Sequence, residues 1–203
     1  TSFVLVVNDD TVIEPDAVAR LVAALQADPG AAAVSPTIGY ASAPTRVWWA
    51  GGTVDRLRAL GTHETEGRGL QGPPREVGCL CGCAILFRAE ALCAVGAFDA
   101  TYFMYGEDVE WSVRAAHAGW RLLHAPEARL AHAVPFPEPP AVAWKIRLRD
   151  RNRRRLVRAH FGAWDRWRFA WWFYPTRVVR IAQYLLARDW PRARAILRGM
   201  TES

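Results

Sequence analysis

The sequence lacks the features of a disulfide-stapled or membrane-spanning protein. Its four cysteines all lie between residues 79 and 93, too few and too clustered for a disulfide framework. No run of about 18 apolar residues is uninterrupted, so we expect no helix that crosses a bilayer. Cys79, Cys81 and Cys83 lack the C-x-x-C spacing of zinc sites. We therefore interpret them as small buried side chains on one face of a strand.

Lysine is almost absent, and the charge is unevenly distributed. The formal net charge is +6, but residues 1–140 carry −6, whereas residues 141–203 carry +12 from 15 arginines and Lys145 against four acidic residues. Such asymmetry predicts two parts with different tasks. We expect a domain at residues 1–134 that can hold a metal ion or a polar substrate. A proline-rich segment separates it from a basic, tryptophan-rich helical extension at residues 141–203 that can contact an anionic partner.

Strand and helix patterns alternate in the first domain. Residues 3–7 and 77–87 are apolar runs that predict two buried strands. Glycines follow the predicted helices at 88–95 and 107–118. Gly- and polar-rich residues 61–74 predict a long loop, which in a compact domain is usually functional or mobile. Further short strands are expected at 33–40, 48–60, 121–125 and 128–132, so the pattern indicates an α/β protein.

Residues 141–203 predict helices alone. Arginines lie opposite apolar residues at helical spacing in 141–161 and 177–187, and segment 164–174 between them contains seven aromatic residues. Basic amphipathic helices next to an aromatic cluster are typical of an element in the membrane interface. An anionic membrane surface is therefore the expected partner. Nucleic acid is ranked last and is not expected, because the acidic residues 1–140 would repel its phosphates.

Three polar groups are candidates for chemistry. Residues 8–10 (Asn-Asp-Asp) follow the first predicted strand, where open α/β sheets bind ligands, and their oxygens suit Mg²⁺ or Mn²⁺. An Asx turn is the alternative. Glu107 and Asp108 open a predicted helix, where acidic residues are favoured by the helix N-terminus, and a general base is the alternative there. His132 ends a strand, and a lone histidine is more often hydrogen-bonded than a metal ligand.

Five motifs occur in a fixed order along the chain, at residues 3–12, 82–88, 95–99, 103–111 and 118–122. They are followed by His132 and by Arg151-Asn-Arg153. Their order and surroundings resemble the inverting family 2 glycosyltransferases of the GT-A fold, particularly the bacterial rhamnosyltransferase-like branch. The resemblance implies a Rossmann-like mixed sheet flanked by helices, with a C-terminal helical extension. It also implies that an N-terminal nucleotide-binding segment of the family is missing.

The resemblance implies a metal site and a donor site. Asp10 and His132 would bind Mg²⁺ or Mn²⁺, and Asn8 stands where the family's DxD motif has its first acidic residue. Asp9 and Asp10 would contact the donor.

The resemblance also implies catalytic and acceptor residues. Asp108 would take the proton from the acceptor hydroxyl, and Glu107 would hold the acceptor. For the two aromatic residues of the acceptor set, Tyr105 and Trp111, packing in the core is an equal alternative. The acceptor-binding residues would be Gly82, Cys83, Tyr105 and Trp111, and the residues that contact a membrane or a diphosphate would be Arg151, Arg153, Arg154 and Arg155.

The expected activity is transfer of a sugar, with inversion, from a nucleotide-sugar donor to a glycan or polyprenyl-linked acceptor. Single displacement needs a clamp on the leaving diphosphate and a base on a different segment, and the candidates satisfy this. The expected location is cytoplasmic, on the inner face of the cell membrane. The alternative is an inactive, truncated remnant that binds glycans or membranes.

Overall fold

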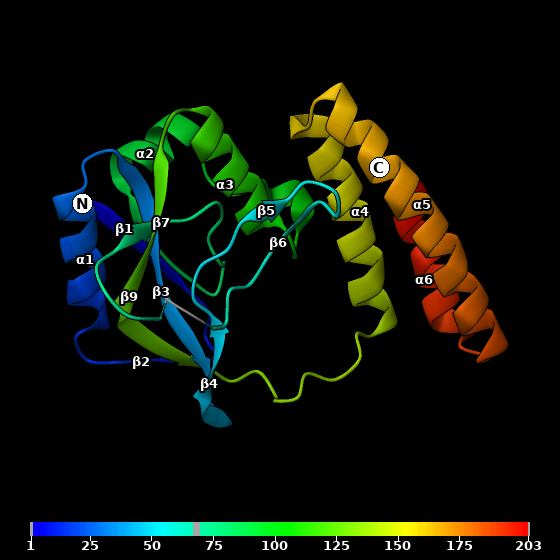
Figure 1. The fold of residues 1–203 in the computed structure, drawn as a ribbon, viewed down its shortest axis with the longest axis horizontal. Coiled ribbons are helices and arrows are strands. Elements are labelled where there is room, and N and C mark those ends of the chain that lie inside the picture. Colours follow the sequence, from blue (N-terminus) through cyan, green and yellow to red (C-terminus); the bar gives the residue numbers. More distant parts are fainter. Residues whose placement is uncertain (1, 67–69, 203) are drawn as a thin grey trace. The chain divides into compact units, whose positions relative to one another are not determined.

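The computed structural model describes residues 2–66 and 70–202, so the middle of the predicted loop 61–74 lies outside the described residues. The chain forms two compact units, which are described separately (Figure 1). Unit 1 comprises Thr1–Val54, Gly61–Asp99 and Asp108–Pro139, and unit 2 comprises Asp55–Leu60, Ala100–Glu107 and Pro140–Ser203.

Unit 1 is built on a mixed sheet. Strands β3 and β9 are parallel, whereas β8 is antiparallel to both β3 and β1. Strand β1 therefore runs in the same direction as β9, and both end at the same edge of the sheet. The strand order is β1 (Phe3–Val7), β8 (Ala84–Arg88), β3 (Ala31–Tyr40), β9 (Arg121–His132) and β2 (Thr11–Ile13). Off this path, β4 (Ala43–Trp49) pairs with β3, and β7 (Arg75–Glu76) pairs with β9. Strands β5 (Val54–Asp55) and β6 (Leu60–Gly61) form a separate pair.

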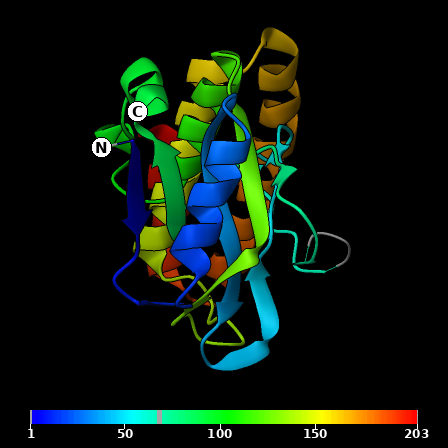
Figure 2. The same cartoon turned by 90° about the vertical axis from the view of Figure 1, so that its left-hand side faces the viewer.

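Helices cover both faces of this sheet. Helix α1 (Ala17–Ala27) packs against one face, where Leu86 lies, and it is seen in front of the sheet in Figure 2. Helices α2 (Ala89–Val95) and α3 (Glu107–His117) pack against the other face, where Ile85 and Phe87 lie. The first eight residues of β3 are all buried because it is covered on both sides. The α/β prediction is confirmed.

Both helices on the second face end where glycine permits a left-handed backbone. Gly96 follows α2 with a φ of +87°, and Gly119 follows α3 with a φ of +84°. Residues with a Cβ rarely adopt this conformation, so these glycines end the helices as predicted.

Three predictions about strands were wrong. Residues 3–7 form a strand, but among the strands of residues 2–66 and 70–202 it pairs with β8 alone, and Val4, Val6 and Val7 are 37–39% exposed. Within the predicted strand at 77–87, regular pairing begins only at Ala84; the cysteines before it are buried, as predicted, but irregular. The strands predicted at 121–125 and 128–132 are the single strand β9, whose register against β3 shifts around Pro126. Proline has no N–H to donate, which favours a bulge rather than a strand end.

Unit 2 is mainly helical, with α4 (Ala143–His160), α5 (Ala163–Leu186) and α6 (Trp190–Thr201). The segments 164–174 and 177–187 belong to one continuous helix, α5, despite Pro175 within it. None of the helices in the described ranges is long and apolar enough to cross a membrane.

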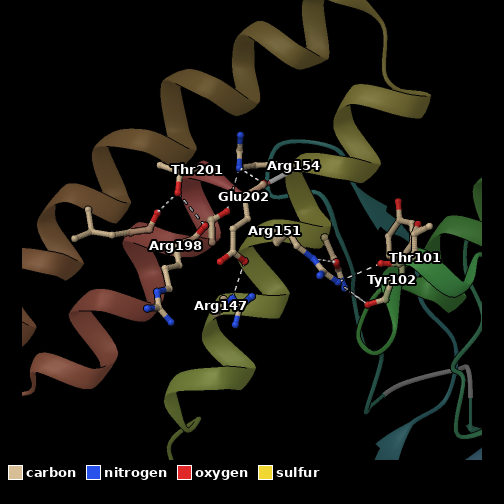
Figure 3. Close-up of polar contacts among 11 residues, drawn as sticks. Thr101, Tyr102, Arg147, Arg151, Arg154, Arg198, Thr201 and Glu202 are labelled. Carbon is tan, nitrogen blue, oxygen red and sulfur yellow. Dashed lines mark hydrogen bonds and ion pairs between the residues drawn. The ribbon is translucent and has the colours of Figure 1, made fainter.

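Helices α4 and α6 approach each other closely at Gly199. A Cβ on this residue would lie 2.8 Å from the backbone oxygen of Arg147. Beside it, the Nε of Arg147 lies 2.6 Å from the carboxylate of Glu202, and the guanidinium of Arg154 donates to the backbone oxygens of Gly199 and Glu202 (Figure 3). These contacts join the end of α6 to α4.

Candidate active site

Asp10 and His132 meet at the edge where β1 and β9 end. Strand β2 pairs antiparallel with β9, and Thr11 is the partner of His132, so the preceding residue is brought beside the imidazole. The Oδ1 of Asp10 lies 3.1 Å from the Nε2 of His132. The Asp10 side chain is 49% exposed, whereas that of His132 is 8% exposed. An open carboxylate is therefore backed by a buried imidazole.

Aromatic and polar groups surround His132. The ring of Trp48 makes an edge contact with it at 4.8 Å between centroids and a second one with His63 at 4.9 Å. The indole N–H of Trp48 donates to Glu138 at 2.8 Å. Trp48, His63 and Glu138 were not among the predicted site residues. His63 lies in the loop predicted at 61–74, and long loops in compact domains are often functional. That position was the signal in the sequence that could have identified His63.

Asp108 is held at the start of α3 by two backbone N–H groups. Its Oδ2 accepts from Gly82 and its Oδ1 from Val109, both at 2.8 Å. A Cβ on Gly82 would lie 3.3 Å from Oδ2, so the glycine allows the backbone to approach the carboxylate. Burial raises the pKa of the Asp108 carboxyl above its ordinary value, and the two N–H donors oppose this shift. A carboxylate with a raised pKa is suited to accept a proton.

The turn at Gly82 and Cys83 contacts both Asp108 and the segment 8–10 that contains Asp10. The N–H of Asn8 donates to the backbone oxygen of Cys83 at 2.9 Å, while the N–H of Gly82 contacts Asp108. Burial, reinforced by the charge of Asp10, raises the pKa of the Cys83 thiol to about 12. The structure thus brings together predicted site residues from four separate segments: 8–10, 82–83, 108 and 132.

Asp10 and His132 are chemically suited to bind a divalent cation. They offer a carboxylate oxygen and an imidazole nitrogen. The Nδ1 of His132 is buried and, within the described residues, has no hydrogen-bond partner. No group of three or more histidine, cysteine, aspartate or glutamate residues in 2–66 and 70–202 could hold a metal. A divalent cation takes more ligands than these two side chains supply, so oxygen atoms of other groups would have to complete its coordination.

Other predicted site residues have different surroundings. Trp111 is fully buried; its ring contacts Phe87 at 4.7 Å, and its N–H donates to the backbone oxygen of Gly96. In unit 2, the guanidinium of Arg149 lies 4.8 Å from the ring centroid of Tyr105. Glu107, the first residue of α3, is partly buried, whereas Asp9 is exposed.

The arginines predicted to contact a membrane or a diphosphate bind backbone oxygens within unit 2. Arg151 donates to Thr101 and Tyr102, and Arg155 also donates to Thr101. Burial lowers the pKa of Arg153 to about 10. Arg154 lies against the end of α6, as described above. Their contact with a membrane or a diphosphate remains a prediction.

The fold of the chain belongs to a known structural class. It resembles the crystal structure of GalNAc-T7 with UDP, GalNAc and Mn²⁺, with a TM-score of 0.51 and 18% identity. The match covers 64% of this chain and 27% of that chain. At this identity the similarity shows the fold alone, which is the GT-A fold of glycosyltransferases.

The family follows from the sequence. Residues 1–155 match the family described as glycosyltransferase-like family 2, and the chain belongs to that family. It is also 43% identical over 63 residues to N-acetylglucosaminyl-diphospho-decaprenol L-rhamnosyltransferases from two strains of Mycobacterium tuberculosis. That match covers 31% of this chain and 20% of each relative. The predicted resemblance to the rhamnosyltransferase-like branch is confirmed.

Proposed function

We propose that the intact protein transfers a sugar from a nucleotide-sugar donor to a hydroxyl of a glycan or lipid-linked acceptor, with inversion and with Mg²⁺ or Mn²⁺. The observation that carries this proposal is the grouping of the Asp10–His132 pair with Asp108 around the turn at Gly82 and Cys83. A lipid-linked acceptor is favoured because the curated relatives are named for a diphospho-decaprenol substrate.

In this proposal, two sets of side chains do different work. Asp10 and His132 would hold the cation, which when bound would supply positive charge to neutralise the departing diphosphate. The carboxylate of Asp108 accepts the proton of the acceptor hydroxyl. Two of its lone pairs accept from backbone N–H groups, which orients the carboxylate and leaves others for the proton. Separate segments carry the two functions, as single displacement requires.

We expect Asp10→Ala to lower transfer by about 100-fold or more, a factor that corresponds to about 3 kcal/mol of lost stabilisation of the transition state. The measurement is transfer by the intact protein at saturating donor, with and without added Mn²⁺. EDTA should remove the wild-type activity, and Mn²⁺ should restore it. Glu14→Gln, which changes an exposed acidic residue of unit 1, is the matched control and should leave the rate unchanged. Full activity of Asp10→Ala, or in EDTA, would exclude this metal site.

The alternative is an inactive remnant, and a measurement of sugar-nucleotide binding distinguishes it from an active transferase. Titration calorimetry of residues 1–203 with candidate sugar nucleotides in Mn²⁺ tests it directly. Micromolar binding that Asp10→Ala abolishes would argue against a remnant. Binding of glycans without any binding of sugar nucleotides would favour it.

The same proposal locates the protein on the inner face of the cell membrane. A lipid-linked acceptor lies in the bilayer, and residues 141–203 carry a net charge of +12, which is complementary to anionic lipids.

A further inference from the structure

One face of α5 exposes a continuous row of aromatic and aliphatic side chains. The row recurs at helical spacing, so its members share one side of the helix. Its residues, called here the α5 outer stripe, are Trp164 (66% exposed), Trp167 (52%), Trp171 (67%), Tyr174 (39%), Val178 (60%) and Leu185 (40%). A contiguous exposed apolar patch on a soluble unit usually marks an interaction surface.

The tryptophans of the stripe contact one another rather than the interior of unit 2. Trp164 stacks on Trp167 at 5.0 Å between centroids and 15° between planes, and Trp167 lies 6.0 Å from Trp171. Indole rings with one apolar body and one polar N–H are the side chains favoured at the boundary between lipid and water.

The opposite side of α5 anchors the helix. Phe169 and Phe173 are 3% and 0% exposed and stack on each other at 4.7 Å. The Nε of Arg177 lies 2.7 Å from the Oδ2 of Asp150 on α4, and its guanidinium lies 4.7 Å from the ring of Phe173. Unit 2 therefore holds α5 in place without the outer stripe, and the stripe is available to a partner.

The positive charge of unit 2 as a whole selects the partner. Ten arginines in the described part of unit 2 are exposed: Arg56, Arg58, Arg149, Arg158, Arg166, Arg168, Arg180, Arg188, Arg194 and Arg198. Residues 141–203 carry a net charge of +12, so two copies of the chain joined through the stripe would repel each other. An anionic lipid surface instead offers apolar depth for the stripe and negative headgroups for the arginines.

We propose that the α5 outer stripe is the surface by which unit 2 lies on an anionic lipid bilayer, with its tryptophans at the level of the headgroups. The inference rests on unit 2 alone and does not depend on sugar transfer.

Vesicle binding tests this surface. The intact protein is sedimented with vesicles of phosphatidylglycerol and phosphatidylcholine, and with vesicles of phosphatidylcholine alone. We expect binding to the anionic vesicles that weakens with salt, and quenching of tryptophan fluorescence by brominated lipid. Trp167→Ala and Trp171→Ala should each weaken binding about tenfold or more. Trp144→Ala, which removes a 47% exposed tryptophan of α4, is the matched control and should bind like the wild type.

Three outcomes would overturn the proposal. One is binding that neither stripe variant weakens. Another is equal weakening by Trp144→Ala. The third is self-association in sedimentation equilibrium that Trp171→Ala abolishes, without vesicle binding by the wild type, which would assign the stripe to a second copy. Because no donor or acceptor is present, failure of the proposed sugar transfer would leave these results unaffected.

Discussion

Replacing Asp108 by asparagine is expected to lower sugar transfer by about 1,000-fold or more while the fold is retained. General base catalysis typically contributes between about 100-fold and 10,000-fold, and an amide cannot take the proton. Asparagine keeps the shape of the side chain but cannot accept from both Gly82 and Val109, so about 1 kcal/mol of hydrogen bonding is lost. Relief from burying a charge opposes that loss. The melting temperature should therefore change by less than about 4 °C.

The control for this variant is Glu90→Gln, which makes the same chemical change at an exposed acidic residue in the first turn of α2. It should transfer like the wild type. Undiminished transfer by Asp108→Asn would remove Asp108 as the base. A large drop in melting temperature would instead indicate a structural role, and circular dichroism during heating distinguishes the two.

The pH profile of the wild type provides a second test of Asp108. The base is active as the carboxylate, so the rate rises with pH as the group loses its proton. Burial raises the pKa of the Asp108 carboxyl, so this rise should extend above the pH range of an exposed aspartate, near pH 4. A rate that is already maximal at pH 4 would contradict the assignment.

Replacing Asn152 by alanine is expected to destabilise unit 2 by about 2 kcal/mol or more and to reduce transfer strongly. Asn152 is 2% exposed, and its amide nitrogen donates to the backbone oxygens of Tyr102, Met104 and Tyr105 at 2.8–3.0 Å. The oxygen of Tyr102 also accepts from Arg151, but the oxygens of Met104 and Tyr105 would lose the Asn152 donor. Losing the partner of a buried polar group costs about 1–3 kcal/mol.

The segment that Asn152 holds has an unusual backbone. Phe103 and Tyr105 have φ values of +61° and +70°, which are unfavourable for residues other than glycine and need support from their surroundings. Glu107 ends this segment in unit 2, and Asp108 is the next residue along the chain. We therefore expect Asn152 to be a positioning residue that acts on the base through the backbone.

Three measurements separate this role from general destabilisation. Asn152→Ala should speed hydrogen exchange of the amides at 103–107, lower the melting temperature by several degrees, and lower kcat more than it raises KM. Asn152→Asp keeps the size of the side chain but cannot donate, so it should show the same defects. Arg158→Ala, at an exposed position on the same helix, should show none. Normal exchange in the segment together with normal kcat would refute the role.

The local elements of unit 1 could be predicted because their signals lie within short segments. Apolar runs identified the strand at 3–7, and glycines marked the ends of the helices at 96 and 119. The burial of β1 was mispredicted because a continuous apolar run does not distinguish a central strand from an edge strand. That distinction depends on which other strands pair with it.

The candidate site was predictable as a list of residues but not as an arrangement. The order of motifs identified Asp10, Asp108 and His132. The contact between Trp48 and His132 and the turn that joins Asn8 to Asp108 arise from pairings between distant segments. Sequence spacing carries no information about those pairings.

The sequence by itself determined the α/β class, the polar residues at the end of the first strand and the basic, aromatic composition of residues 141–203. Hydrophobic periodicity and charge are local properties that the chain carries in any conformation. Only the tertiary structure decided that the arginines at 151–155 bind backbone oxygens and that α5 exposes one aromatic face while burying another. Those outcomes depend on which side chains unit 2 can bury, and burial is decided by packing between helices.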